Sequence, residues 1–222
     1  MNNGQNMEVQ EQALLNALQA EGEPYFSDFT AEYALVEARL KVPRLLHSLG
    51  VAQTARLLAE KYGAEPAKAY LAGLCHDIAK EIPAEEMLAY VKRSALAEDA
   101  DVLAHRVLWH APAGSVLLAD LAAEYPRLDT EVQNACLWHT LGKPAMTLLE
   151  QLVFIADLIE PGRDFPDLAQ IRRAAESGPA EGVAACMYGA IHFLEVQNKF
   201  VHPLAYQGYA YYKNIAELKG RE

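Results

Sequence analysis

Positive charge is scarce in this sequence. Its 222 residues include 19 Lys and Arg against 30 Asp and Glu, so the formal net charge at pH 7 is −11. The field of such a molecule repels polyanions and gives no electrostatic footprint for DNA or RNA. We therefore expect no nucleic-acid partner. A phosphate-bearing ligand would need a local positive site, which bound metal ions can supply inside an acidic protein.

Cysteine is also rare. The three cysteines, Cys75, Cys136 and Cys186, are odd in number, far apart and set in apolar surroundings. These features are typical of small core residues in a reducing compartment rather than of a disulfide framework. We therefore expect neither disulfides nor cysteine-based chemistry.

Long hydrophobic runs are absent as well. Charged residues interrupt LLEQLVFIADLIEP and VAACMYGAIHFLEV before either reaches the ~20 residues needed to span a bilayer. The stretch MNNGQNMEVQEQ lacks the basic segment and apolar stretch of a secretory signal. We expect no membrane partner and a cytoplasmic location.

Helical periodicity extends over almost the whole sequence, and prolines and glycines divide it into segments. Thr30 is a plausible N-cap for the second segment, and no paired alternating runs indicate a hairpin. We expect an all-α orthogonal bundle of about nine to eleven helices. The expected helices cover residues 8–20, 30–41, 43–62, 66–80, 83–94, 111–123, 130–140, 146–159, 167–176, 180–199 and 205–218.

Histidines and aspartates interrupt otherwise apolar segments at five places. They are His47 in RLLHSLGVA, His76 and Asp77 in GLCHDIAK, His110 in VLWHAPAGS, His139 in CLWHTLG and Asp157 in FIADLIEPG. Each alone is typical of an ordinary core residue with a hydrogen-bond partner. Together, four imidazoles and two carboxylates would be costly to bury without partners, and divalent cations would satisfy them all. Six such ligands are too many for one tetrahedral zinc, so two metals sharing a carboxylate fit better.

The stretch AGLCHDIAK places His76 and Asp77 side by side. Successive helical side chains diverge by roughly 100°, so the imidazole can bind one metal while the carboxylate of Asp77 leans toward a second. Lys80 follows His76 by four residues and is expected on the same helix face, where its ammonium would contact phosphate. The alternative for Lys80 is an ordinary solvated lysine at a helix end.

The order of these phrases resembles a known family. The pattern H…HD…D is that of the HD-domain superfamily of metal-dependent phosphohydrolases. HDIAK, HAPAGS, HTLGKPAM, FIADLIEPGR and FVHPLAY together resemble the bacterial YqeK family of symmetrical bis(5′-nucleosyl)-tetraphosphatases. The resemblance covers roughly residues 34–210 and implies a single HD phosphohydrolase domain, to which we assign residues 36–222. Residues 1–35, polar at first and less cohesive, are expected to form an N-terminal extension or flanking helices. It also implies symmetrical hydrolysis of a small-molecule substrate, diadenosine tetraphosphate, to two ADP.

The resemblance further implies a dinuclear centre, usually of iron, with manganese or cobalt as alternatives. By position, one metal would take His47, His76, Asp77 and Asp157, and the other would take His110 and His139, with Asp77 bridging. A metal-activated hydroxide would then be the nucleophile. Asp77 and Lys80 are the candidate catalytic residues.

Five residues are candidates for binding the substrate: Arg44, Lys80, Thr140, Gly142 and Arg163. The two arginines lie close in sequence to predicted metal ligands and would contact phosphate, and for both a surface salt bridge is the alternative. Thr140 and Gly142 follow a predicted ligand at a helix end, where a hydroxyl and backbone N–H groups could meet phosphate oxygens. Simple helix termination is the alternative there.

Two other functions stay open on the sequence alone. One is an HD phosphohydrolase that acts on another nucleotide or phosphate ester, and the other is a non-catalytic sensor of dinucleotide alarmones. The complete set of predicted ligands disfavours the sensor. Leu46 stands where the family often has an acidic residue, which puts one hydrogen bond behind the metal ligands in doubt. Homodimerisation, and the roles of residues 1–35, His105, His192 and His202, also stay open.

Overall fold

The structure is a computed structural model that describes the backbone of residues 2–219 and the side chains of residues 9–219. Within these residues the chain forms thirteen α-helices, one 3-10 helix and no β-strand, which confirms the all-α prediction. The elements are α1 (Asn2–Glu21), α2 (Tyr25–Asp28), α3 (Thr30–Glu37), α4 (Val42–Tyr62), α5 (Pro66–Cys75), α6 (Ala84–Val91), α7 (Ala100–Ala104), η1 (Arg106–Leu108), α8 (His110–Leu121), α9 (Thr130–Trp138), α10 (Leu148–Ile159), α11 (Leu168–Ser177), α12 (Pro179–Val196) and α13 (Pro203–Lys219).

The helix count exceeds the nine to eleven expected. The additional helices are α2 and α7, which have only four and five residues and are therefore too short to show a helical period. Thr30 is not an N-cap, because that position belongs to Phe29 and Thr30 is the first residue of α3. The Phe29 N–H donates to Tyr25 O at 3.1 Å, so the chain passes from α2 into α3 without an extended capping residue.

Local sequence sets the ends of the helices that surround the centre of the molecule. Pro43 lies in the first turn of α4, and Gly63 ends that helix in a left-handed conformation with φ of 76°. Asp129 caps α9. Thr147 and Glu150 form a capping box at the start of α10, in which each side chain accepts from the other residue's N–H.

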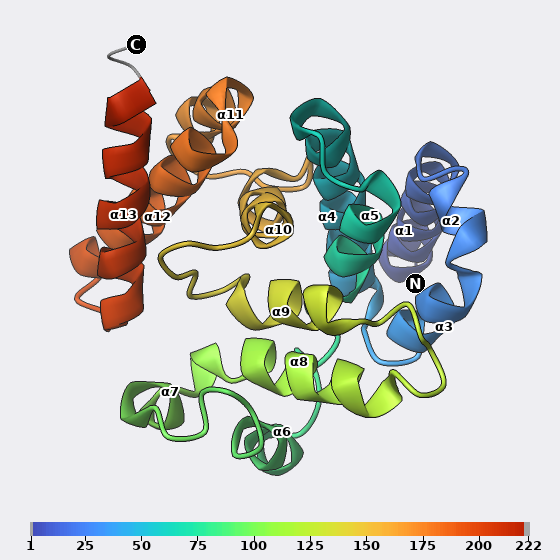
Figure 1. Ribbon diagram of the computed structural model, residues 1–222. Helices are drawn as coiled ribbons and strands as arrows, with labels where there is room; N and C mark the ends of the chain where they lie inside the picture. The colour runs from blue at the N-terminus through green and yellow to red at the C-terminus, as the bar shows by residue number, and fades with distance from the viewer. Residues whose placement is uncertain (1, 220–222) are drawn as a thin grey trace.

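Helix α10 occupies the middle of the bundle, where Figure 1 shows it nearly end-on. It contacts α4, α5, α9, α11 and α12, while α8 packs on α9 and α13 packs on α12. Buried apolar side chains from these helices form one continuous core. The arrangement brings α4, α5, α9 and α10 together, and α8 reaches the same region through α9.

Gly73 allows α4 and α5 to approach closely. A Cβ atom at this position would lie 2.8 Å from Cα of Ala52 and 2.9 Å from the carbonyl oxygen of Val51, both of which belong to the α4 backbone. No side chain fits there without moving one helix. The close approach places the residues after α5 beside the first half of α4, where His47 lies.

The segment predicted as an N-terminal extension packs on the bundle. Leu15 of α1 and Phe29 are buried members of the continuous core. Gln53 Nε2 of α4 donates to the carbonyl oxygen of Leu18 at 3.2 Å. Residues 9–35 therefore share apolar and polar contacts with the rest of the structure.

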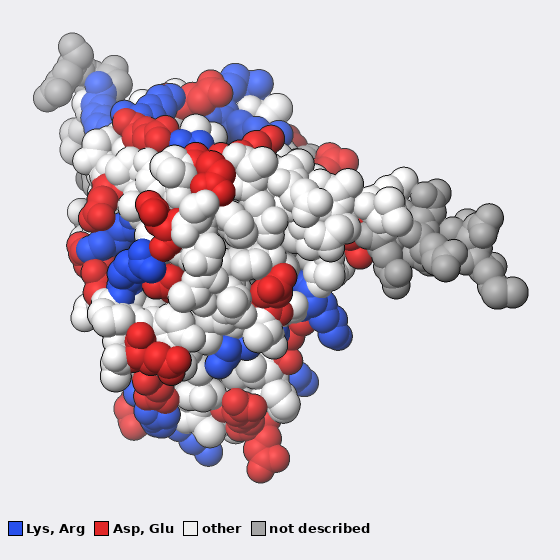
Figure 2. All heavy atoms as spheres, turned by 90° about the vertical axis from the view of Figure 1, so that its right-hand side faces the viewer, with Lys and Arg blue, Asp and Glu red and all other residues white. Residues whose placement is uncertain are grey.

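The distribution of surface charge and the state of the cysteines match what the composition led us to expect. The face shown in Figure 2 intersperses basic side chains with acidic ones instead of gathering them into one basic area. Cys75, Cys136 and Cys186 are buried and free. Among the described residues, no helix combines the length and apolar character that crossing a membrane would require.

Candidate metal centre

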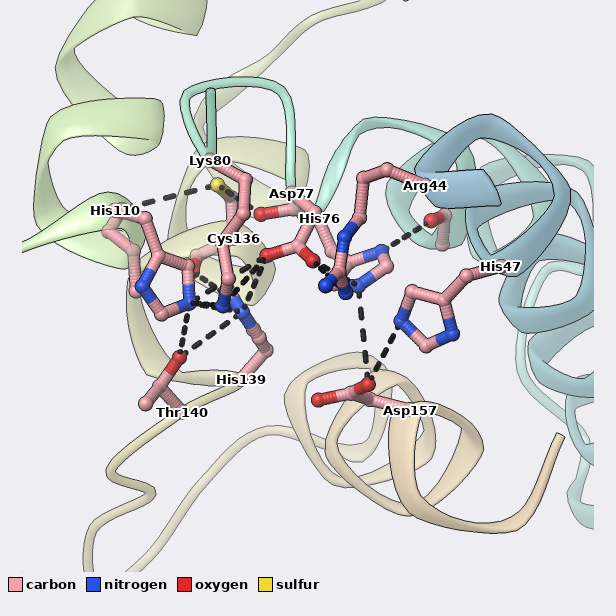
Figure 3. Close-up of polar contacts among 12 residues, drawn as sticks. Arg44, His47, His76, Asp77, Lys80, His110, Cys136, His139, Thr140 and Asp157 are labelled. Atoms are coloured by element: carbon pink, nitrogen blue, oxygen red, sulfur yellow. Dashed lines mark hydrogen bonds and ion pairs between the residues drawn. The ribbon is translucent and has the colours of Figure 1, made fainter. Parts of the chain in front are cut away.

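The six predicted metal ligands come together from five parts of the chain, and Figure 3 shows their side chains turned toward one another. His47 belongs to α4, His110 is the first residue of α8, and Asp157 belongs to α10. His139 follows α9, while His76 and Asp77 follow α5. Three overlapping groups have ligand atoms within 4.8 Å of one another: His47, His76 and Asp77; His76, His139 and Asp157; and Asp77, His110 and His139.

The HDIAK stretch is not helical, which corrects the expectation of one helix over residues 66–80. Helix α5 ends at Cys75, and residues 76–81 form successive turns. Ile78 N–H donates to Cys75 O at 3.1 Å, and Lys80 N–H donates to Asp77 O at 2.8 Å. The sequence gives no stop signal at Cys75, because residues 69–79 are all buried and the apolar run continues past the helix end.

Three of the four histidines are oriented by the backbone. Each ring donates its Nδ1–H to the carbonyl oxygen three residues earlier: His76 to Gly73 (2.7 Å), His110 to Val107 (3.0 Å) and His139 to Cys136 (2.6 Å). A neutral imidazole that donates from Nδ1 has its lone pair on Nε2. The same local contact therefore directs three Nε2 lone pairs toward the centre.

His47 is oriented by a carboxylate that the sequence reasoning missed. Its Nδ1 lies 3.1 Å from Oε1 of Glu160, which is buried and also accepts from the Gly162 N–H. A carboxylate behind a histidine fixes the ring and raises its basicity as a metal ligand. The signal was present in FIADLIEPGR, where Glu160 follows Asp157 by three residues. Glu160 thus gives His47 a supporting hydrogen bond, although Leu46 replaces the acidic residue that the family often has beside this histidine.

The two oxygens of Asp77 face different histidines. Oδ1 lies 3.4 Å from His110 Nε2 and 3.5 Å from His139 Nε2. Oδ2 lies 3.6 Å from His76 Nε2. Asp157 Oδ1 in turn lies 3.0 Å from His47 Nε2 and 3.9 Å from His76 Nε2. Asp77 thus stands between one set of donors that includes His76 and Asp157 and another that includes His110 and His139.

The protonation states of His76, His110, Asp77 and Asp157 favour cation binding. Burial lowers the pKa of His76 to about 4 and holds the pKa of His110 well below its ordinary value, so both rings are neutral at pH 7. Burial by itself raises the pKa of Asp77, but the neighbouring His76 and His139 hold it well below the ordinary value. For Asp157 the raising effect of burial is likewise outweighed, mainly by the hydrogen bond with His47. Both carboxylates are therefore ionised.

Two polar atoms at the centre lack a hydrogen-bond partner among the described residues. They are His76 Nε2 and Asp77 Oδ1, both of which are buried. His110 Nε2 and His139 Nε2 both carry lone pairs and lie 3.2 Å apart, and within the described part of the chain only the Lys80 ammonium and the Thr140 hydroxyl are near enough to donate to them. Acceptors that face one another in a buried site are costly unless a cation lies among them. Imidazole nitrogens and carboxylate oxygens fit divalent first-row transition metals, so the residues present fit such ions.

Three cationic side chains border the centre and are each about one third exposed. Arg44 NH1 lies 2.9 Å from Asp77 Oδ2, and Lys80 Nζ lies 2.9 Å from His110 Nε2. Arg163 pairs with Asp157 and donates from Nε to the Asp157 carbonyl at 2.7 Å. Burial lowers the pKa of Lys80. All three predicted phosphate contacts are thus beside predicted metal ligands.

The two predicted contacts after His139 differ. Thr140 Oγ1 lies 2.9 Å from His110 Nε2 and 3.0 Å from His139 Nε2, directly at the centre. Gly142 is buried, packs against Met187 and Phe154, and donates its N–H to Trp138 O at 2.8 Å. That N–H is already used inside the protein, so the structure does not support the expected phosphate contact of Gly142. Its φ of 61° shows a role in turning the chain after α9.

An all-helical bundle that gathers four histidines and two aspartates around one buried centre has the donor set of a protein that binds divalent metal ions. Comparison with known proteins makes this specific, because a family model described as HD domain matches residues 44–162. A protein of Bacillus subtilis (strain 168) named bis(5′-nucleosyl)-tetraphosphatase, symmetrical, is 37% identical over 171 residues, which are 77% of this chain and 89% of that protein. A protein of Staphylococcus aureus (strain NCTC 8325 / PS 47) with the same name is 40% identical over 141 residues, 64% of this chain and 71% of that protein.

A solved structure shows the same fold. It is a crystal structure from Clostridium acetobutylicum, described as a predicted HD superfamily hydrolase involved in NAD metabolism. It superposes with a TM-score of 0.76 at 31% identity and covers 84% of this chain and 97% of its own. The chain therefore belongs to the HD domain family and, within it, to the group of HD hydrolases that includes the symmetrical bis(5′-nucleosyl)-tetraphosphatases.

Proposed function

We propose that this protein hydrolyses dinucleoside tetraphosphates symmetrically and converts diadenosine tetraphosphate to two molecules of ADP. The observation that carries the proposal is the convergence of six nitrogen and oxygen donors on one buried centre, with orphaned acceptor atoms and three cationic side chains around it. The names of the related proteins from B. subtilis and S. aureus support the same substrate and the same symmetrical cleavage.

We further propose that the centre holds two divalent cations. One would be held by His47, His76, Asp77 and Asp157, and the other by His110, His139 and the second oxygen of Asp77. When bound, the cations supply Lewis acidity toward water and toward phosphoryl oxygens. The ligand set suits iron, with manganese or cobalt as alternatives. Three buried, unpaired cysteines fit a reducing compartment such as the cytoplasm.

The reaction adds one water molecule across the central anhydride bond. The water oxygen forms a bond to one of the two central phosphorus atoms, the bond from that phosphorus to the bridging oxygen breaks, and one ADP leaves while the other carries the new oxygen. Asp77 faces one set of donors with each of its two oxygens and so would fix the position of one set relative to the other. The Thr140 hydroxyl lies beside His110 and His139. A phosphate group at the centre would therefore be within reach of its O–H, which can donate to a phosphate oxygen.

The cationic side chains stabilise the charge that develops on the leaving ADP. Lys80 donates to His110 Nε2 in this structure, and that lone pair cannot serve a proton and a metal at once. Metal binding at His110 would therefore free the Lys80 ammonium for a phosphate oxygen. Arg44 and Arg163 can add contacts through the guanidinium groups now paired with Asp77 and Asp157. Donors aimed at developing charge contribute the largest share of many enzymatic rate enhancements.

Product analysis tests the proposal. Metal-loaded protein is incubated with diadenosine tetraphosphate, and the nucleotides are separated by chromatography. The proposal predicts ADP alone. AMP plus ATP would show asymmetrical cleavage, and intact substrate with hydrolysis of another nucleotide would assign the centre to a different phosphate ester. Binding without turnover of any nucleotide would indicate a sensor.

A further inference from the structure

Cys136 of α9 is buried beside the candidate metal centre, and its sulfur contacts two other parts of the chain. The thiol donates to the carbonyl oxygen of His76 at 3.1 Å and lies 3.8 Å from the carbonyl oxygen of Ala111 in α8 (Figure 3). One side chain therefore connects α9 with α8 and with the turn that follows α5.

The carbonyl that accepts from this thiol belongs to the peptide bond between His76 and Asp77. Among the described residues, the Cys136 thiol is the only hydrogen-bond donor to this carbonyl. His76 and Asp77 are both buried, and a buried carbonyl without a partner is costly. The orientation of this peptide determines how the two side chains diverge. The thiol contact therefore acts on the directions of the His76 ring and the Asp77 carboxylate together.

Cys136 is also linked to the two histidines that face Asp77 Oδ1. Its carbonyl oxygen accepts from His139 Nδ1 at 2.6 Å. Ala111, beside the sulfur, directly follows His110 in α8. Asp77 Oδ1 lies 3.4 Å from the Nε2 atom of His110 and 3.5 Å from that of His139. Cys136 thus has a polar contact with each of the three segments that surround Asp77 Oδ1.

Gly114 of α8 makes room for the sulfur. A Cβ atom at this position would lie 2.8 Å from Cys136 Sγ, and 3.6 and 3.7 Å from side-chain atoms of Ile78 and Ala79. The space between α8 and α9 accommodates the sulfur only because residue 114 has no side chain. A methyl group at position 114 could instead fill the space that the sulfur would leave, but it could not replace the hydrogen bond.

We propose that Cys136 is a positioning residue of the metal centre, whose thiol fixes the peptide between His76 and Asp77. The distance from the Asp77 carboxylate to the rings of His110 and His139 depends on that peptide. The inference rests on the proposed function for the presence of the metal ions. Cys136 touches neither metal nor substrate in this role, and it acts through the residues that it orients.

Three variants separate the hydrogen bond from the space that the sulfur fills. Cys136→Ala removes the donor and should raise the dissociation constant for Co(II) about 10–100-fold, the usual effect of losing a contact that orients a metal ligand. Cys136→Ser keeps a donor and should bind Co(II) with close to wild-type affinity. The double variant Gly114→Ala/Cys136→Ala refills the vacated space. It should therefore regain the thermal stability that Cys136→Ala loses, but not the affinity for Co(II).

Competition with a chelator measures the dissociation constant, and the visible absorption spectrum of bound Co(II) reports the geometry of its ligands. Cys136→Ala should change this spectrum. Cys186→Ala is the matched control, because Cys186 is as buried as Cys136 (both 0% exposed) and lies on α12, which carries none of the six predicted ligands. The control should lower the thermal midpoint of the metal-free protein and leave both the affinity for Co(II) and its spectrum unchanged.

Three results would overturn the inference. Recovery of Co(II) affinity together with stability in the double variant would show that the sulfur only fills space. A sulfur-to-cobalt charge-transfer band in the wild type would make Cys136 a metal ligand. The third result needs no variant to fold: at least one S–H stretching band in the Raman spectrum of the wild type should lie below the frequency of a free thiol. All S–H bands at the free frequency would exclude the hydrogen bond.

These measurements are independent of turnover. A wild-type protein that binds Co(II), with the expected differences among the variants, but releases no ADP from diadenosine tetraphosphate would refute the proposed function and leave the role of Cys136 standing. Release of ADP alone by the wild type, with equal Co(II) affinity in wild type and folded Cys136→Ala, would refute the inference and leave the proposed function standing.

Discussion

His47 Nδ1 lies 3.1 Å from Oε1 of Glu160, so among the four predicted histidine ligands this one is oriented by a carboxylate and the other three by backbone carbonyls. Glu160 immediately follows α10, three residues after Asp157. The C-terminal end of α10 therefore supplies one predicted ligand, Asp157, and the carboxylate that orients a second, His47 of α4. This arrangement couples the geometry of α4 to that of α10.

Glu160→Gln should weaken metal binding by about 10–100-fold, because the neutral amide makes His47 a weaker ligand. Competition with a chelator measures the dissociation constant. Glu150→Gln is a matched control: Glu150 is as buried as Glu160 (3% and 5% exposed) and lies at the other end of α10, where glutamine preserves the capping box. Equal metal affinity in the two variants would show that the Glu160 contact does not position His47 for a metal.

Lys80→Gln should lower kcat for the tetraphosphate by about 100–1,000-fold, as expected for removal of one donor that stabilises developing charge. Metal content should stay at the wild-type level, since Lys80 is not among the predicted ligands. Steady-state kinetics and elemental analysis of the same preparation separate the two effects. Lys143→Gln, which removes a lysine paired with Glu150 at 3.4 Å, is the control. Loss of metal together with activity would make Lys80 a structural residue of the centre.

Gly73→Ala should reduce the free energy of unfolding by about 1–3 kcal/mol, because a Cβ atom there overlaps the α4 backbone. The shift between α4 and α5 should also move His76, which donates to the Gly73 carbonyl. Urea denaturation gives the first quantity and metal affinity the second. At Gly189 of α12 a Cβ atom would meet only the end of the Ile171 side chain, at 3.1 Å, so Gly189→Ala should be neutral or mildly stabilising. Equal stability of the two variants would contradict a close approach at Gly73.

Asp99→Asn should show a pH-dependent loss of stability. Burial raises the pKa of Asp99, but hydrogen bonds from the Val102 N–H and from His202 bring it below the ordinary value. A carboxyl whose folded-state pKa lies below its unfolded-state pKa stabilises the protein above the unfolded value, and the stabilisation is lost as the pH falls through the folded value. Asparagine still caps α7 but removes the charge.

The unfolding free energies of wild type and Asp99→Asn, measured by urea denaturation, should therefore differ at pH 7 and converge below about pH 4. Asp101→Asn, within the first turn of α7, should change the free energy of unfolding by no more than about 0.5 kcal/mol at either pH. A difference for Asp99→Asn that persists unchanged at low pH would exclude the charge as its cause.

Much of the fold follows from local signals in the sequence. Pro43 and Gly63 mark the ends of α4 because proline suits a first helical turn and glycine tolerates the left-handed conformation that ends a helix. Short helices such as α7 cannot be predicted in this way, because five residues are too few to show the hydrophobic periodicity of a helix. The end of α5 cannot be predicted either: the apolar run continues through His76 and Asp77, and only tertiary packing decides that the helix stops at Cys75.

The candidate site was predictable to the extent that residue type determines it. Histidines and aspartates in apolar segments identify the six donors, because burying them without partners is costly. Supporting contacts depend on geometry between distant segments, as with Glu160 behind His47. Gly142 shows the reverse case: its position after His139 suggested a phosphate contact, but the structure uses its N–H to close the turn after α9. The hydrogen bond from Cys136 to the turn after α5 could not be read from the sequence, since it joins positions 60 residues apart.

The central claim is that Asp77 stands between two cation sites, with one oxygen toward His110 and His139 and the other toward His76. The most direct test is the number of metal ions per chain, measured by elemental analysis after loading with Fe(II) without oxygen and removal of unbound metal. The account predicts two ions per wild-type chain and at most one in Asp77→Asn. Two ions retained in folded Asp77→Asn, or no ion bound by the wild type, would contradict it.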